Sequence, residues 1–182
     1  LHKIQVWDYE TLRDMLDMRY VNDFREKALH PRHGKMMGSA QNPDIFFQAR
    51  EAANPFYNAL PEIVEQTFDK INKRLGTSYG LFNYYGHKSP VHAIIAMGSV
   101  CETVREYLEA NPEKEYGLIS VHLYRPFSAS HLLKVLPDSV KQISVLDRTK
   151  EPGSVGEPLY LDVLAALKEG GRENIQVFSG RY

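Results

Sequence analysis

Positively charged side chains follow several short apolar runs in this sequence, at the points where the runs end. If those runs are parallel strands, their carboxyl ends meet at one edge of a sheet, where open α/β sheets bind ligands. Cations near an exposed helix N-terminus favour anions such as phosphate or carboxylate groups. The sequence therefore predicts an anion-binding or interface edge made of Ser99, Arg125, Arg148, Thr149, Lys150 and Arg181.

The segment LDRTKEPGSVGEP (146–158) supplies half of this predicted edge. Asp147 and Glu151 lie in the same segment and partly cancel the charges of Arg148 and Lys150, which weakens the case for a phosphate site. Contact with another protein surface, or simple exposure to water, therefore stays open as an alternative.

Other residues that could carry chemistry do not form a catalytic or metal-binding pattern. His30 and His33 have no cysteine partners and no neighbouring H-E-x-x-H motif, so we expect surface loop histidines rather than a zinc site. Cys101 falls in the first turn of a predicted helix, but no base accompanies it, and we expect a buried, inert thiol. The sequence also lacks the G-x-G-x-x-G, Walker and G-x-S-x-G motifs. No catalytic residue and no metal ligand is therefore predicted.

The elements that would position the charged edge lie between about residue 90 and residue 182. Four apolar runs, VHAIIAM, GLISVHLY, QISVL and IQVFSG, alternate with three segments of helical periodicity. Ser99 and Glu102 have the spacing of a capping box at the start of the first of these helices. Such alternation predicts an α/β fold with three layers, in which helices flank a mainly parallel sheet.

The first 86 residues are expected to be mainly helical. A short apolar opening, KIQVW, leads to Asp8, which can cap a helix. Residues His30 to Asp44 indicate a long irregular connection. Near the end of this connection, Asn42 followed by a proline indicates the start of another helix. A further helix is predicted to begin at Asn54 and to end at Gly76.

Composition excludes several classes of protein. The 182 residues are 43% hydrophobic and 25% charged with a formal net charge of −1, so no bulk field indicates nucleic acid or an anionic membrane. The single cysteine excludes an internal disulfide and fits a reducing compartment. No apolar stretch approaches the ~20 residues of a membrane span. The start at leucine suggests a piece of a longer chain.

Four long stretches of the chain resemble pyruvate:ferredoxin (flavodoxin) oxidoreductase, in the order in which that family has them. They are SAQNPDIFFQAREAANPFYNALPEIVE, LFNYYGHKSPVHAIIAMGSVCETVREYL, VHLYRPFS and LDRTKEPGSVGEPLYLDVLAAL. The resemblance implies that residues 1–44 are a linker or helical arm that leaves a preceding thiamine-diphosphate-related domain. Residues 45–182 would then be a second domain similar to the transketolase carboxy-terminal domain, with a helical lead-in at 45–86 and an α/β core at about 90–182.

The resemblance also implies an activity for the whole enzyme, which is oxidative decarboxylation of pyruvate with coenzyme A to acetyl-CoA, carbon dioxide and reduced ferredoxin or flavodoxin. Thiamine diphosphate, magnesium and iron–sulfur clusters would belong to its other domains, and no cofactor is expected in this segment. The expected partners are those other domains, a second copy of the full-length enzyme, and ferredoxin or flavodoxin bound elsewhere, with no nucleic acid or membrane. A cytoplasmic location is expected, or an organelle in an anaerobic eukaryote.

Three functions follow, which the sequence leaves open. The first is a non-catalytic structural domain, in which the loop LDRTKEPG holds one domain against another. The second is a module whose cationic edge binds the phosphates of coenzyme A. The third is a stand-alone α/β enzyme, for which no nucleophile and base pair is evident.

Overall fold

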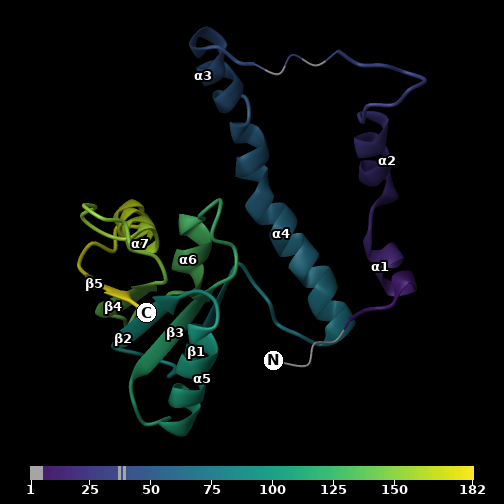
Figure 1. Ribbon diagram of the computed structural model, residues 1–182. Helices are drawn as coiled ribbons and strands as arrows, with labels where there is room; N and C mark the ends of the chain where they lie inside the picture. Colours follow the sequence, from purple (N-terminus) through teal and green to yellow (C-terminus); the bar gives the residue numbers. More distant parts are fainter. Residues whose placement is uncertain (1–5, 37, 39) are drawn as a thin grey trace. The chain divides into compact units, whose positions relative to one another are not determined.

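The computed structural model describes residues 6–36, 38 and 40–182 (Figure 1). Contacts between residues divide the chain into two compact units, one up to Ala53 and the other Asn54–Tyr182. No helix among the described residues has both the length and the apolar character that a membrane crossing requires.

The regular elements described in the first unit are helices. Asp8 caps the first helix, as predicted, and its Oδ1 accepts a hydrogen bond of 2.7 Å from the amide of Thr11. Proline occupies the first turn of the third helix, which follows Asn42 as the sequence indicates. Residues 3–5 of the predicted apolar opening, and residues 37 and 39 of the predicted connection, lie outside the described residues. The helices of this unit are α1 (Tyr9–Met15), α2 (Met18–Glu26) and α3 (Pro43–Glu51).

The second unit begins with a long helix, α4 (Asn54–Leu75), which has the bounds predicted from the sequence. It ends where Gly76 adopts a positive φ of 69°, a backbone conformation that favours glycine. Val64 and Phe68 of α4 pack against the main hydrophobic core.

The α/β core contains a five-stranded sheet in the order β1-β3-β2-β4-β5. The four strands predicted from apolar runs are present and parallel to one another, which confirms the fold class. The remaining strand pairs antiparallel with β3, and it corrects the expectation of a purely helical lead-in up to residue 86. The strands are β1 (Phe82–Gly86), β2 (His92–Ala96), β3 (Tyr116–Val121), β4 (Gln142–Asp147) and β5 (Gln176–Arg181).

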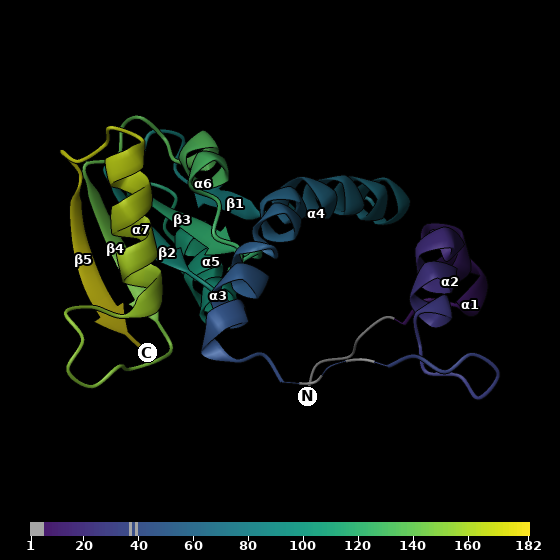
Figure 2. The same cartoon turned by 90° about the horizontal axis from the view of Figure 1, so that it is seen from above.

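Helices pack against both faces of this sheet, so the unit has the three predicted layers. Figure 1 shows α6 and α7 on one side of the strands and α5 on the other, and in Figure 2 α7 runs beside β4 and β5. The larger core lies on the α6 and α7 side, around the fully buried Ile95, Ile143 and Val163. These helices are α5 (Val100–Ala110), α6 (Ala129–Val135) and α7 (Pro158–Glu169).

Candidate functional site

The six residues of the predicted edge each lie at or just after the carboxyl end of a parallel strand. Ser99 follows β2, Arg125 lies in the connection after β3, and Arg181 is the last residue of β5. Arg148, Thr149 and Lys150 begin the loop after β4 and are exposed. The structure thus places all six at the same edge of the sheet, but it gives them different partners.

Arg181 is held by a carboxylate that the sequence analysis did not identify. Glu157 is only 3% exposed at the N-cap position of α7, and its Oε1 accepts a hydrogen bond from the Arg181 guanidinium. Its Oε2 accepts a second bond, of 2.7 Å, from the amide of Glu151. The Arg181 hydrogen bond, supported by the Glu151 amide, holds the pKa of the Glu157 carboxyl below its ordinary value. Glu157 therefore joins the loop after β4 to the end of β5.

Asp147 holds the other end of the same loop. It is 2% exposed as the last residue of β4, and its two carboxylate oxygens accept hydrogen bonds from the amides of Leu159 (3.0 Å) and Tyr160 (3.2 Å). Burial raises the pKa of Asp147, while the two amides oppose that rise. Asp147 thus faces the first turn of α7, so the expectation that it cancels the charges of Arg148 and Lys150 gives way to a capping role.

Arg125 is bound to α7 as well. Its Nη1 lies 2.6 Å from Oδ2 of Asp162, and its guanidinium stacks over the ring of Tyr124 at 3.9 Å from the ring centre. The side chain remains half-exposed, so this ion pair is of the kind that contributes about 0–1 kcal/mol. Two of the four predicted cations are therefore paired with carboxylates of, or next to, α7.

The predicted capping box at Ser99 is wrong. Ser99 already has helical backbone angles (φ −64°, ψ −26°), and its side chain makes no capping hydrogen bond. An N-cap residue needs an extended backbone to direct its hydroxyl at the amide three residues on. The Glu102 side chain forms an ion pair in place of the predicted cap, with its Oε1 lying 3.5 Å from Nη1 of Arg105.

The last residue of the chain also crosses the charged edge. The hydroxyl of Tyr182 donates a hydrogen bond of 2.7 Å to the carbonyl of Met97, which follows β2, and the Tyr182 amide donates to the carbonyl of Asp147. The roles of Glu157, Asp162 and Tyr182 went unrecognised in the sequence. Only Glu157, directly before a proline at a helix start, carried a signal that could have indicated its position.

The residues that could hold a metal or redox centre do not fit one. Cys101 is buried, as predicted, and burial raises the pKa of its thiol. The rings of His30 and His33 stack on each other at 4.7 Å. Within residues 6–36, 38 and 40–182, no group of three or more His, Cys, Asp or Glu side chains is placed to hold a metal ion.

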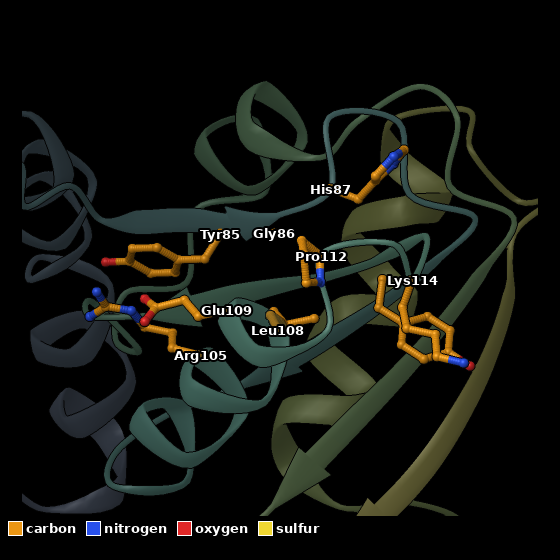
Figure 3. A pocket seen from close by; sticks show the side chains of 9 residues that line it. Tyr85, Gly86, His87, Arg105, Leu108, Glu109, Pro112 and Lys114 are labelled. Carbon is orange, nitrogen blue, oxygen red and sulfur yellow. The ribbon is translucent and has the colours of Figure 1, made fainter.

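A separate pocket lies beside the C-terminal part of α5 and the first residue of β3, at the other end of the parallel strands (Figure 3). Its volume is about 290 Å³, and Leu108 and Pro112 contribute apolar surface. The guanidinium of Arg105 lies 4.3 Å from the ring centre of Tyr85, at one end of the pocket. Other lining residues are His87, Glu109, Lys114 and Tyr116.

Comparison with known proteins agrees with the resemblance seen in the sequence. The family described as pyruvate:ferredoxin oxidoreductase core domain II matches residues 92–181. The pyruvate-flavodoxin oxidoreductase of Enterobacter agglomerans is 54% identical over 185 aligned residues, which cover the whole chain. The chain belongs to the pyruvate:ferredoxin oxidoreductase family. The pyruvate:ferredoxin oxidoreductase of Moorella thermoacetica is 52% identical, again over the whole chain.

The chain spans only 16% of the length of these two oxidoreductases. The matched core domain II contains β2 to β5 and every residue of the predicted edge. A solved 2-oxoglutarate:ferredoxin oxidoreductase from Magnetococcus marinus, with 2-oxoglutarate, coenzyme A and succinyl-CoA bound, aligns over 82% of the chain at 12% identity with a TM-score of 0.42.

Proposed function

We propose that this segment of a pyruvate:ferredoxin oxidoreductase is a non-catalytic structural domain. The full enzyme would decarboxylate pyruvate oxidatively with coenzyme A and pass the electrons to ferredoxin or flavodoxin. The observation that carries the proposal is that several ionisable groups at the carboxyl edge stabilise the fold instead of remaining free to bind a ligand. Asp147, Glu157 and Arg181 bind one another or the backbone, and so hold the loop after β4 in place.

The cofactors of such an enzyme would be held by its other domains. An iron–sulfur cluster requires about four cysteine ligands, whereas this chain has one cysteine, which is buried. Thiamine diphosphate and magnesium are likewise assigned to the rest of the enzyme, as are the contacts with ferredoxin or flavodoxin. We further propose that the enzyme is a cytoplasmic homodimer, and that residues 1–44 lead into this domain from the one before.

The architectural role would be exerted by the exposed part of the loop after β4. Its two ends are fixed by Asp147 and Glu157, so Arg148 and Lys150 project from an anchored loop. A loop fixed in this way can present its cations to a neighbouring domain in one register. We infer that this contact mainly fixes how the two domains are positioned. Its contribution to the binding free energy is small, because exposed ion pairs are weak.

A second candidate function is binding of the phosphates of coenzyme A at this edge. The observation that favours it is the exposure of Arg148, Thr149 and Lys150, which keeps two cations and a hydroxyl accessible beside one another. The pairing of Arg125 with Asp162 and of Arg181 with Glu157 argues against it, because both pairs reduce the positive field at the edge.

Calorimetric titration of the 182-residue chain with coenzyme A separates these two functions, with thiamine diphosphate and Mg²⁺ as the control and circular dichroism to verify folding. The structural role predicts no heat of binding from either ligand. A Kd near micromolar, equivalent to about −8 kcal/mol, that is lost in Arg148→Ala/Lys150→Ala would establish the coenzyme A site instead.

A further inference from the structure

One half of one sheet face is left open in the unit Asn54–Tyr182. Helix α5 packs against β1 and β3, where Leu118 is completely buried beneath it. On the same face, burial decreases across the next strands, because Ile94 of β2 is half-buried and Phe178 of β5 is 48% exposed. On the opposite face α6 and α7 bury the core (Figure 1). The open half is therefore the part of the α5 side that lies over β2, β4 and β5.

The strand register makes this open half a continuous surface. Ile94 lies opposite Ser144 of β4, and Ser144 lies opposite Phe178. Two residues further along these strands, on the same face, Leu146 lies opposite Gly180. A hollow of about 330 Å³ in this surface is lined by His92, Ile94, Tyr116, Ser144 and Leu146. We call these residues, together with Phe178 and Gly180, the open face.

Most of the surface of the open face is apolar, and none of its residues is an acid, a lysine or an arginine. Its polar groups are the Tyr116 hydroxyl and the side chains of His92 and Ser144, and the last two satisfy each other through a bond of 2.9 Å between Nε2 and Oγ. Burial lowers the pKa of His92, which favours the neutral imidazole. Parallel strands are normally covered by helices on both faces. This surface is therefore suited to an apolar covering element rather than to water or an ionic ligand.

The dimensions of the open face match one helix. It crosses from β2 to β5, which is two strand spacings or about 10 Å, and an α-helix with its side chains is about 10–12 Å wide. Ser144 is small, so a helix could approach the strands closely there, whereas the side chain of Leu146 already lies over Gly180.

We propose that an α-helix from another part of the same polypeptide, outside these 182 residues, packs its apolar stripe on the open face. The inference rests on the proposed function as one domain of a longer enzyme. The length of the relatives selects this occupant: the chain matches them from end to end yet spans 16% of their length. Most of such a polypeptide is therefore available to supply the missing helix.

Site-specific photo-crosslinking in the full-length enzyme tests this proposal. p-Benzoylphenylalanine would be placed at Phe178 and, in a separate control, at Tyr107, an aromatic residue of α5 with nearly the same exposure (49%). Mass spectrometry of enzyme assembled from mixed ¹⁴N and ¹⁵N subunits would distinguish links within one polypeptide from links between copies. We expect position 178 to link, several-fold more than position 107, to one helical segment outside residues 1–182 of the same polypeptide.

Three results would overturn the proposal: links from position 178 only within residues 1–182, links only to a second copy, or no more linking than at position 107. Hydroxyl-radical footprinting of the unmodified enzyme provides a second measurement that needs no substitution, and there Phe178 should be several-fold more protected than Tyr107 once each rate is normalised to the intrinsic reactivity of its ring. Equal protection would contradict the covering helix. Coenzyme A binding at the charged edge would overturn the proposed function without affecting either readout, so the two failures are distinguishable.

Discussion

Glu157 connects two parts of the charged edge from its position at the start of α7, because its buried carboxylate binds the Arg181 guanidinium and the Glu151 amide. Since its pKa is lowered in the folded chain, Glu157 stabilises the fold above its ordinary pKa of about 4.5, and this stabilisation is lost as the pH falls through the folded-state pKa. Glu157→Gln should therefore lower the free energy of unfolding at pH 7. Between pH 5 and pH 3, the free energy of unfolding should then fall less steeply in the variant than in the unmodified chain.

Urea denaturation across that pH range checks this prediction. Glu173→Gln is the matched control, because Glu173 is an exposed glutamate outside the edge. If the two variants show the same pH dependence, the role assigned to the Glu157 carboxylate is wrong.

Asp147 is the second residue whose replacement should weaken the loop after β4. Asp147→Ala leaves the amides of Leu159 and Tyr160 without their acceptors at a buried helix start, which should cost about 1–3 kcal/mol of unfolding free energy. Asp138→Ala is a suitable comparison, since Asp138 has a fully exposed side chain paired with Arg172 and should contribute about 0–1 kcal/mol. Equal losses in the two variants, measured by urea denaturation, would contradict the capping role of Asp147.

At the scale of elements, the end of β1 depends on a glycine. Gly86 has a φ of 112°, and a Cβ at this position would lie 2.6 Å from the backbone carbonyl oxygen of Tyr116. Gly153 also has a positive φ, 83°, but has nothing within 4 Å of a built Cβ. Gly86→Ala should therefore destabilise the chain by more than Gly153→Ala, for which backbone strain alone costs about 1–2 kcal/mol.

Thermal or urea unfolding of the two glycine variants measures the difference. Equal destabilisation would show that the contact between β1 and the start of β3 is loose enough to accept a methyl group.

The sequence predicted most of these elements, for identifiable reasons. β2 and β4 come from nearly continuous apolar runs, and α4 is bounded by Asn54 and by Gly76. β1 was missed because its sequence, FNYYG, mixes an asparagine and two tyrosines and shows neither an apolar run nor a clear alternation. It pairs antiparallel with β3, whose partner residues lie 31 to 39 positions further along the chain, and such pairing has no local signal.

At the scale of the whole molecule, the sequence located the charged edge but not its pairing. The order of strands and helices was enough to bring Arg125, Arg148 and Arg181 to one edge. Their partners could not be inferred, because Asp162 lies 37 residues from Arg125 and Glu157 lies 24 residues from Arg181, and only the folded position of α7 brings them together. The function likewise belongs to a larger molecule, since the chain is 16% of the length of the relatives it matches.

The central claim is that the carboxyl edge serves architecture rather than coenzyme A binding, and its most direct test is a comparison of two double variants in the full-length enzyme. Arg148→Ala/Lys150→Ala removes the exposed cations of the edge. Lys141→Ala/Lys168→Ala removes two exposed cations away from it, one beside the start of β4 and one in the last turn of α7. For each variant, the KM for coenzyme A would be measured together with the mass and thermal stability of the assembled enzyme. We predict that only the first variant weakens assembly, with its KM for coenzyme A unchanged. A raised KM with intact assembly, or no difference between the two variants, would contradict the account.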